Sequence, residues 1–293
     1  MARRKILFIV NPHSGVGDKS NWIAIATKML AQDFDLEFKY TTHRGHACEL
    51  AQRAVTECVD IVAAVGGDGT VNEVASAIVN TETALAILPM GSGNGLARDL
   101  GIHTLLPFNA LETIKQGHSI RIDYGTANGV PFFCTCGVGF DAHISWRFSR
   151  GRQRGFWNYL ILCIREYFRY KPKEIILEFD GQQCVKRRAF IVNCANTQQL
   201  GNNAYIAPQA DLQDGLLNVT IVRPFGFWGA IRIGTMLFLK QIDKIKYTET
   251  FTCRSLTMTV PRGTPFHYDG EPVRMPSEIR IEARPQGLKV IVP

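Results

Sequence analysis

The stretch "AAVGGDGTVNEV", residues 63–74, places three glycines, an aspartate and a threonine between a short apolar run and a segment with helical spacing. Glycine loses more conformational entropy on folding than any other residue, so a row of glycines indicates backbone that bends sharply or approaches something closely. The apolar run before the row predicts a strand, and the segment after it predicts a helix. We therefore expect a glycine-rich turn from a strand into a helix.

The sequence on either side of this turn alternates between strand and helix patterns as far as residue 117. Strand-like runs at 5–10, 35–40, 60–65 and 84–89 are interleaved with helical spacing at 21–32, 46–57, 71–80, 95–100 and 108–117. Such alternation favours a mostly parallel sheet with both faces covered, in which ligands bind where strand carboxyl ends meet helix amino ends. Three glycine-containing segments, 11–15, 66–70 and 91–95, fall at such places.

From about residue 124 the pattern changes to mainly strands, with helical stretches near 156–169 and 226–239. This change predicts a second, antiparallel β domain, so the expected fold class is α/β plus all-β. We expect an α/β domain over 1–124 and a β domain over 125–284, with 285–293 returning to the first domain.

Composition and terminal sequence indicate a chain of the cytoplasm. The 293 residues are 46% apolar and 20% charged, and "MARRKILFIVNP" has too short an apolar run for a signal peptide. No uncharged apolar run approaches the roughly 18–20 residues that cross a bilayer. The eight cysteines are scattered without CxxC, CxxxC or CxxH spacing, which favours reduced core thiols over zinc ligands.

The basic charge is concentrated in one region. Between His143 and Arg188 there are eleven Lys and Arg against four Asp and Glu, an excess of +7 that equals the net charge of the whole chain. Such a patch is typical of proteins that bind phosphate, nucleic acid or an anionic membrane. Large apolar residues crowd this region and no nucleic-acid-binding motif is present, so we expect no nucleic acid partner.

Backbone N–H groups at a strand-to-helix turn, together with the helix dipole, favour a phosphate ligand, although a tight turn without any ligand has the same local sequence. Walker A and the protein kinase motifs are absent. Asp68 would repel a phosphate placed directly against it. It is better suited to orient a metal-bound water, a ribose, a neighbouring loop or an attacking hydroxyl, or to bind local amides as a turn aspartate.

Six motifs in order resemble the diacylglycerol kinase catalytic family, which includes sphingosine, ceramide and bacterial lipid kinases. They are "NPHSG" (11–15), "VGGDGTVNEV" (65–74), "PMGSGNGLARDLG" (89–101), "GVGFDA" (137–142), "APQADLQDGLLNV" (207–219) and "HYDGEPV" (267–273). The resemblance implies transfer of the γ-phosphoryl group of ATP to a lipid hydroxyl with Mg²⁺. It also implies a Rossmann-like, NAD-kinase-like N-terminal domain, a C-terminal β-sandwich and an active site in the cleft between them.

The resemblance further implies roles for individual residues. Asp214 is the side-chain ligand of Mg²⁺, with the carbonyl groups of Asp211 and Leu216 nearby. Glu271 is the base that accepts the proton of the lipid hydroxyl, Asp269 positions either the metal or Glu271, and Asp68 completes the catalytic set. The residues that hold ATP are Asn11, Pro12, His13, Ser14, Gly15, Thr41, Gly66, Gly67, Asp68, Gly69, Thr70, Val71, Asn72 and Ser92, with Thr42 as an alternative to Thr41.

The acceptor lipid is less closely defined. Many glycerolipid kinases have Asp after the Gly-x-Gly-Asn loop, whereas here Asn94 is followed by Gly95 and Leu96, and "GSGNGLA" is closer to the sphingosine kinase pattern "GSGNALA". Diacylglycerol or a related lipid is the first expectation, and a sphingoid base is the alternative. An NAD kinase and a catalytically silent nucleotide- or lipid-binding regulator remain as further alternatives.

The stretch 145–173 combines arginines with aromatic and aliphatic residues, which suits an anionic lipid interface but is also compatible with a core helix that has a solvated flank. We expect this stretch to dock the chain peripherally on the inner face of the membrane. The sequence is also compatible with a homodimer.

Overall fold

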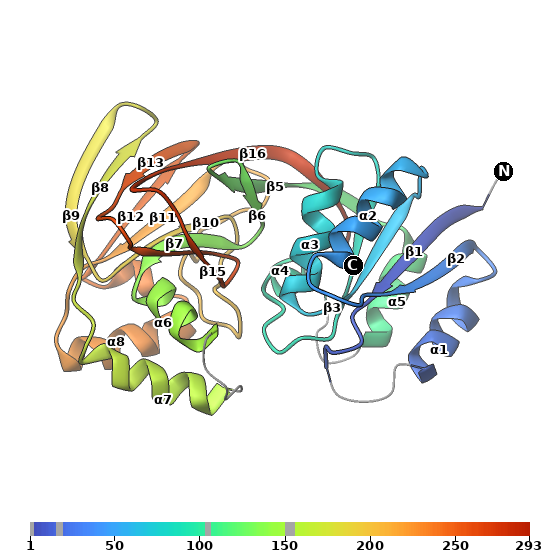
Figure 1. Ribbon diagram of the computed structural model, residues 1–293, viewed down its shortest axis with the longest axis horizontal. Helices are drawn as coiled ribbons and strands as arrows, with labels where there is room; N and C mark the ends of the chain where they lie inside the picture. The colour runs from blue at the N-terminus through green and yellow to red at the C-terminus, as the bar shows by residue number, and fades with distance from the viewer. Residues whose placement is uncertain (1–2, 16–19, 103–106, 150–155) are drawn as a thin grey trace. The chain divides into compact units, whose positions relative to one another are not determined.

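The computed structural model describes residues 3–15, 20–102, 107–149 and 156–293. The chain divides into two compact units (Figure 1). Unit 1 is Met1–Asp123 with Pro285–Pro293, and unit 2 is Tyr124–Arg284. Two strands, β5 (Ser119–Ala127) and β16 (Glu278–Ile291), contribute residues to both units. The expected combination of an α/β unit with an antiparallel β unit is confirmed.

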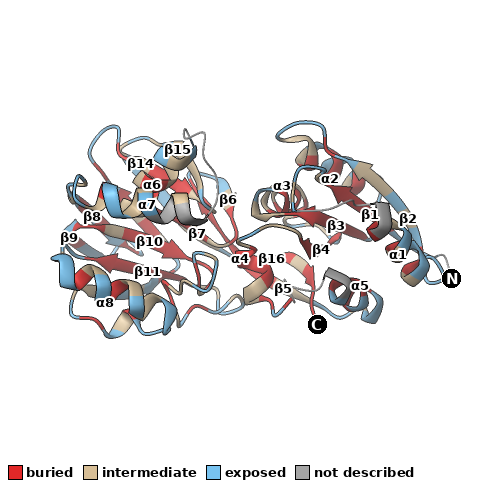
Figure 2. Cartoon of the chain, turned by 90° about the horizontal axis from the view of Figure 1, so that it is seen from below, coloured by how far each residue is buried: buried red, intermediate tan, exposed pale blue. Residues whose placement is uncertain are grey.

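Unit 1 contains a parallel sheet in the order β2-β1-β3-β4, which β16 extends through Val290 opposite Leu85. Helices lie on both faces of this sheet, with α2 beside α3 and α1 beside α5 (Figures 1 and 2). The strands are β1 (Arg4–Val10), β2 (Phe34–Tyr40), β3 (Ile61–Gly66) and β4 (Ala84–Pro89), and the helices are α1 (Ser20–Leu30), α2 (His46–Thr56), α3 (Asp68–Ile78), α4 (Gly95–Asp99) and α5 (Pro107–Gln116).

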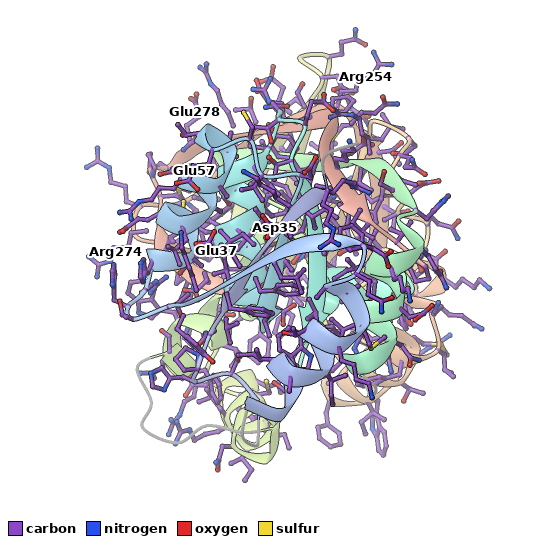
Figure 3. The ribbon with its side chains drawn as sticks, turned by 90° about the vertical axis from the view of Figure 1, so that its right-hand side faces the viewer. Asp35, Glu37, Glu57, Arg254, Arg274 and Glu278 are labelled. Carbon is purple, nitrogen blue, oxygen red and sulfur yellow. The ribbon has the colours of Figure 1, made fainter. Side chains whose placement is uncertain are left out.

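Burial along the strands follows their places in the sheet. Every residue of β3 and β4 is buried, as expected for inner parallel strands covered on both faces. Strand β2 is at the edge, and its Asp35 and Glu37 are exposed (Figure 3). Charged side chains on an edge strand disfavour pairing with another chain. The apolar core of unit 1 therefore lies around β3 and β4.

Unit 2 is built from two antiparallel sheets that enclose a common core. One contains β16, β13, β8 and β9, and the other has the order β12-β11-β10-β7-β14-β15. Fully buried side chains of both sheets, including Phe266, Met258 and Val219, form one cluster. The elements are β6 (Val130–Phe132), β7 (Thr135–Gly139), α6 (Phe140–Ser149), α7 (Phe156–Tyr167), β8 (Lys173–Phe179), β9 (Gln183–Ala189), β10 (Ile191–Ala195), β11 (Leu217–Val222), α8 (Phe227–Phe238), η1 (Ile242–Lys244), β12 (Thr248–Cys253), β13 (Ser255–Thr259), β14 (Pro265–Tyr268) and β15 (Glu271–Arg274).

Three local features differ from the sequence-based expectations. Helix α3 begins at Asp68, so Gly69 and Thr70 belong to the helix rather than to the turn. The apolar run 130–138, whose sequence alone favours a single strand, is divided into β6 and β7. Helix α6 was not expected, because its short apolar spacing follows a strand without a turn signal.

All eight cysteines are free thiols, and within the described ranges every helix is too short or too polar to cross a bilayer.

Candidate functional site

The carboxyl ends of four parallel strands in unit 1 lie along one edge of the sheet. Backbone hydrogen bonds tie each strand end to the next, which keeps the loops that follow them in a fixed row. These bonds run from Thr41 N to Val10 O (2.9 Å), from Asn11 N to Val65 O (3.0 Å) and from Met90 N to Gly66 O (2.8 Å). The three glycine-containing segments and Thr41 therefore share one rim, which we call the unit 1 rim.

Asn11 links the first loop of the rim to the second. Its Nδ2 donates to Thr70 Oγ1 at 3.1 Å, and its Oδ1 accepts from His13 N at 2.9 Å. Ser14 Oγ donates to the carbonyl oxygen of Asn11 at 3.0 Å. Gly15 has a left-handed φ of +74°, and a Cβ there would lie 2.9 Å from the carbonyl oxygen of Met90. The first loop is thus shaped by contacts with the loops after β3 and β4.

The carboxylate of Asp68 binds the loop after β4. Its Oδ2 accepts from Asn94 N at 2.8 Å and its Oδ1 accepts from Gly95 N at 2.7 Å. Gly95 starts α4, so Asp68 satisfies amides that have no partner within that helix. Of the roles considered for Asp68, the geometry supports that of orienting a neighbouring loop.

Glycines of the second and third loops are required by their close approach. A Cβ at Gly91 would lie 2.6 Å from Gly67 Cα, and a Cβ at Gly93 would lie 2.7 Å from Asp68 Oδ2. Gly69 is different, because a Cβ there would meet nothing within 4 Å and the residue is exposed. Close packing therefore explains why Gly67, Gly91 and Gly93 are glycines. It does not explain Gly69, beside which there is open space.

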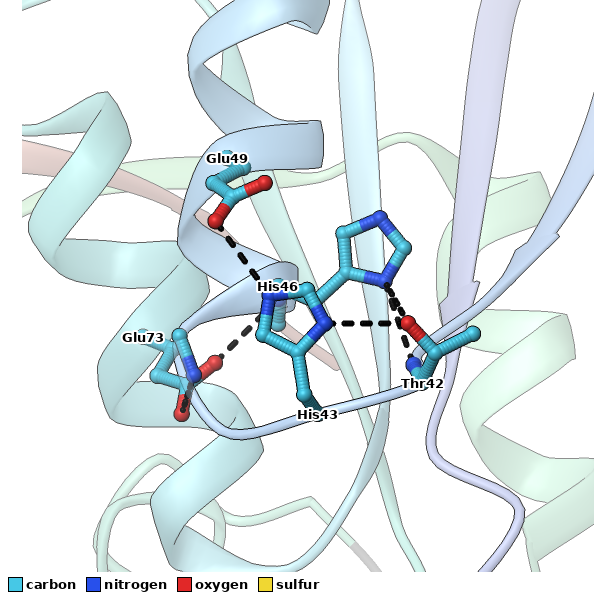
Figure 4. A network of polar contacts seen from close by, with 7 residues as sticks. Thr42, His43, His46, Glu49 and Glu73 are labelled. Carbon is cyan, nitrogen blue, oxygen red and sulfur yellow. Dashed lines mark hydrogen bonds and ion pairs between the residues drawn. The ribbon is translucent and has the colours of Figure 1, made fainter.

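A polar network holds the loop between β2 and α2 (Figure 4). Thr42 Oγ1 lies 3.0 Å from Nδ1 of both His43 and His46, whose rings stack with centroids 4.8 Å apart. Glu73 of α3 accepts from Gly45 N at 2.9 Å and from Ala47 N at 3.2 Å, at the start of α2. The hydroxyl group of Thr42 is engaged in this network, whereas Thr41 is buried at the end of β2.

The other residues predicted to hold ATP differ in exposure. Pro12, His13 and Ser92 are exposed, and Asn72 is half-buried. Val71 is buried in the inner face of α3, so only its backbone can reach a ligand at the rim. At the start of α3, Thr70 N donates to Gly67 O at 3.0 Å, the amides of Asp68 and Gly69 come before this first bond of the helix, and Gly67 provides no side-chain cap. Unit 1 thus offers backbone donors at a helix start beside an open glycine, which fits a phosphate group.

In unit 2, Asp269 and Gly270 form the two-residue turn between β14 and β15. Both have left-handed φ, +47° and +79°, as a type I′ hairpin turn requires. The Asp269 carboxylate accepts three backbone N–H groups at the start of β7: Oδ2 from Phe133 (2.8 Å), and Oδ1 from Cys134 (2.7 Å) and Thr135 (3.0 Å). Asp269 therefore fastens the hairpin to β7.

Glu271 is the first residue of β15 and pairs with Tyr268 across the hairpin. It is half-buried. Because its position follows directly from the turn, the three hydrogen bonds of Asp269 fix the backbone that carries the Glu271 side chain. The arrangement fits a positioning role for Asp269 and leaves the carboxylate of Glu271 as the candidate base.

A buried polar group near the same hairpin was not identified as a site from the sequence. His267 Nε2 lies 3.0 Å from Asp141 Oδ2, which also accepts from Asn193 Nδ2 at 3.4 Å. His267 and Asn193 are almost fully buried, and among the residues that the structure describes His267 Nδ1 and Asn193 Oδ1 have no hydrogen-bond partner. Asp141 and His267 stand in the "GVGFDA" and "HYDGEPV" motifs, so the motifs themselves were the signal for this cluster.

The predicted magnesium segment is an exposed turn of unit 2. Asp211 Oδ1 accepts from Gln213 N and Asp214 Oδ1 accepts from Leu216 N, both at 2.9 Å. Two carboxylates and the carbonyl groups of one turn are hard oxygen donors, which suit Mg²⁺. Among the described residues, no three His, Cys, Asp or Glu side chains gather closely enough to hold a metal ion. The donors therefore fit Mg²⁺ only together with water or substrate oxygens.

The stretch 145–173 lies on α6 and α7, and its Arg150, Arg152 and Arg154 are outside the described residues. Glu166 is buried on α7, with His143 Nε2 at 2.8 Å and Arg147 Nε at 3.4 Å from its Oε2. Arg165 and Arg169 lie 3.6 Å from Oε1. The hydrogen bond to His143, assisted by Arg147, holds the pKa of Glu166 below its usual value despite burial. Part of the basic charge of this stretch thus neutralises a carboxylate inside unit 2.

Comparisons with known families match the chain in two consecutive segments. Residues 5–127 match the diacylglycerol kinase catalytic domain, and residues 134–292 match the YegS C-terminal NAD kinase β-sandwich-like domain. The second segment alone covers more than half of the 293 residues.

Individual relatives align over 80% to 99% of the chain. A diacylglycerol kinase of Mycobacterium tuberculosis (strain ATCC 25618 / H37Rv) is 28% identical over 297 residues, which cover 99% of this chain and 95% of the relative. A diacylglycerol kinase of Bacillus subtilis (strain 168) is 27% identical, with 80% and 78% covered. The crystal structure of a diacylglycerol kinase from Bacillus anthracis str. Sterne has a TM-score of 0.78 at 23% identity, with 99% and 97% covered, and supports the fold.

Proposed function

The chain belongs to the diacylglycerol kinase catalytic domain family, and we propose that it transfers the γ-phosphoryl group of ATP to the hydroxyl group of a lipid. Diacylglycerol or a related lipid is the proposed acceptor, and a sphingoid base is the second candidate because of the "GSGNGLA" sequence at 91–97. The single observation that carries the proposal is the pair of family matches, which together account for both units.

The geometry of the unit 1 rim supports the nucleotide half of this proposal. The rim presents loop amides, the first turn of α3 and the open space above Gly69 at the carboxyl edge of a parallel sheet. We propose that the phosphates of ATP bind there through backbone N–H groups, since the chain has no P-loop lysine. Asp68 orients the third loop for this purpose through Asn94 and Gly95.

We propose that residues of unit 2 act on the lipid acceptor. Glu271 takes the proton from the lipid hydroxyl as the oxygen forms its bond to the γ-phosphorus. The bond between that phosphorus and the β–γ bridging oxygen breaks, and ADP leaves with the electron pair. Asp269 holds the hairpin so that the Glu271 side chain keeps its position.

Magnesium is the proposed metal, held by Asp214 with the carbonyl groups of Asp211 and Leu216. When bound, Mg²⁺ neutralises charge that develops on the phosphate oxygens. Positioning and charge neutralisation dominate phosphoryl transfer, whereas a general base contributes roughly 10²–10⁴-fold.

Because the proposed acceptor is a lipid, the chain must reach a membrane surface. We propose that the stretch 145–173 contributes to peripheral association, because the side chains of Arg165 on α7 and Arg169, two residues after its end, are exposed beside exposed apolar residues. Anionic headgroups attract such side chains with about 1 kcal/mol each.

A lipid kinase assay with labelled ATP and Mg²⁺ tests the proposal. The acceptors are diacylglycerol, a sphingoid base and NAD, each given to the wild-type chain and to Glu271→Gln. We expect a labelled lipid from the wild type and a decrease in kcat of about 10²–10⁴-fold in the variant. Label in NAD alone, or in none of the acceptors, would contradict the proposal, and an unchanged kcat in the variant would remove Glu271 as the base.

A further inference from the structure

Exposed apolar side chains are concentrated on one part of unit 2. Twelve large apolar side chains are exposed in the described part of the chain, and eight of them lie on α7, on α8 or on the residue that follows each helix. We call these eight the α7–α8 surface: Ile161, Ile164, Phe168, Phe227, Trp228, Ile231, Phe238 and Leu239. Scattered apolar residues are normal on a protein surface, but a group of this size indicates a partner.

Helix α8 is apolar on two faces. Its inner face places Ile233 in a buried cluster with Val222, Ile242 and Ile245. On its outer face Trp228 is 80% exposed and Phe238 is 57% exposed. The inner face already accounts for the packing of the helix against unit 2, so the outer apolar residues serve another contact.

Helices α7 and α8 lie on the same side of unit 2 (Figures 1 and 2). Tyr167 at the end of α7 donates its hydroxyl hydrogen to the carbonyl oxygen of Phe225 at 3.1 Å, and the two rings stack with centroids 5.8 Å apart. Phe225 immediately precedes α8, and Phe190 packs against both rings. The aromatic cluster thus connects the end of α7 to the start of α8.

The charges around α8 favour an anionic partner. Four basic residues and one acidic residue stand between Phe225 and Tyr247, and α8 itself contains no acidic residue. Arg232 is exposed on α8 and makes no ion pair with any residue that the structure describes. A two-fold contact between copies would bring these cations toward one another, whereas lipid phosphates would neutralise them.

We propose that the α7–α8 surface docks on an anionic bilayer, with the side chains of Trp228, Ile231 and Phe238 in the interfacial layer and Arg232 at the headgroups. Tryptophan and phenylalanine are favoured at this depth, and basic side chains extend from it toward phosphates. The inference rests on the proposed function for its purpose, because a lipid acceptor resides in a bilayer. It adds α8, which lies outside the stretch 145–173, to the membrane contact.

Co-sedimentation of the full chain with vesicles tests the proposal. The vesicles are phosphatidylcholine alone or phosphatidylcholine mixed with phosphatidylglycerol. We expect the wild type to partition onto the mixed vesicles, and the double variant Trp228→Ser/Ile231→Ser to partition about tenfold or more weakly because it loses interfacial apolar area. Arg232→Gln is expected to weaken partitioning about fivefold, and only on the anionic vesicles.

The matched control is Val130→Ser/Ile176→Ser, which removes two exposed apolar side chains that lie on strands β6 and β8 of unit 2 rather than on these helices. This control is expected to partition within about twofold of the wild type. Equal partitioning of the wild type and Trp228→Ser/Ile231→Ser would overturn the proposal. A wild-type dimer in sedimentation velocity that the Trp228→Ser/Ile231→Ser variant converts to monomer, with vesicle binding unchanged, would assign the surface to a second copy and also overturn it.

Kinase activity on a short-chain acceptor in free solution separates the two proposals. The α8 variants are expected to retain wild-type activity there, because no α8 residue has a place in the catalytic set. Vesicle binding without any lipid phosphorylation would contradict the proposed function and leave the docking surface standing. Lipid phosphorylation together with vesicle binding that the α8 variants do not change would support the proposed function and contradict the docking surface.

Discussion

The unit 1 rim and the unit 2 hairpin use a carboxylate in similar ways to position different groups. Asp68 binds two backbone amides of a neighbouring loop, and Asp269 binds three backbone amides of a neighbouring strand. What they position differs, because the rim presents mainly backbone N–H groups whereas the hairpin presents the side chain of Glu271. Two of the three carboxylates expected to be catalytic therefore bind backbone amides of a neighbouring segment.

The hairpin offers the largest expected effect on stability. Asp269→Ala leaves three backbone N–H groups without their acceptor and places alanine at a left-handed φ of +47°. Each unsatisfied buried group costs about 1–3 kcal/mol, so we expect the free energy of unfolding to fall by about 3–5 kcal/mol. Chemical denaturation of Asp269→Ala and Glu271→Ala measures this difference. A smaller loss for Asp269→Ala than for Glu271→Ala would reverse the roles assigned within the hairpin.

Two glycines of the unit 1 rim are expected to differ in their effect on stability. Gly91→Ala forces a Cβ to within 2.6 Å of Gly67 Cα, and we expect a loss of about 1–3 kcal/mol in unfolding free energy. Gly69→Ala meets nothing within 4 Å and lies in a helix, so its stability is expected to be unchanged or higher by up to about 1 kcal/mol. Thermal denaturation of both variants provides the measurement. Equal destabilisation would show that packing, rather than ligand approach, requires Gly69.

Unit 2 also carries a buried charge whose effect depends on pH. The pKa of Glu166 lies below its usual value because of His143 and Arg147, so its ionised form stabilises the folded state above about pH 4.3, the ordinary value. Glu166→Gln is expected to lower the free energy of unfolding by about 1–2 kcal/mol at pH 7. The difference from the wild type should shrink as the pH falls below about 4. A difference that grows in acid would contradict this sign.

The smallest expected effect concerns the start of α2 in unit 1. Glu73 binds the amides of Gly45 and Ala47 there, and no side chain of the α2 sequence caps the helix. Glu73→Gln keeps one oxygen acceptor and loses the negative charge near the helix dipole, so we expect a loss of about 0.5–1 kcal/mol. Hydrogen exchange at the amides of α2 reports the change locally. Faster exchange throughout unit 1 would instead assign Glu73 to the core of the unit.

The sequence was sufficient to predict the architecture because apolar periodicity is a local signal. The buried runs of β3 and β4 and the spacing of α2 indicate their elements directly. The same alternation predicted that the three glycine-containing segments would share one edge. Helix α6 lacked this signal, since only Ala142 and Ile144 among its residues are buried.

The roles of single carboxylates depend on partners that are distant in sequence. Asp68 binds amides 26 and 27 residues away, and Asp269 binds amides 134 to 136 residues away. Spacing within a motif contains no information about such partners. The pairing of Asp141 with His267 spans 126 residues and could not be predicted for the same reason, although both residues belong to motifs of the family.

Binding of a non-hydrolysable ATP analogue most directly tests the division of roles between backbone loops and the Glu271 side chain. Its Kd is measured by calorimetry for the wild type, Gly69→Ala and Glu271→Gln, together with kcat for lipid phosphorylation. We predict a Kd at least about tenfold higher for Gly69→Ala, where a methyl group occupies the phosphate space, and a wild-type Kd with a strongly reduced kcat for Glu271→Gln. A wild-type Kd for Gly69→Ala together with a raised Kd for Glu271→Gln would contradict it.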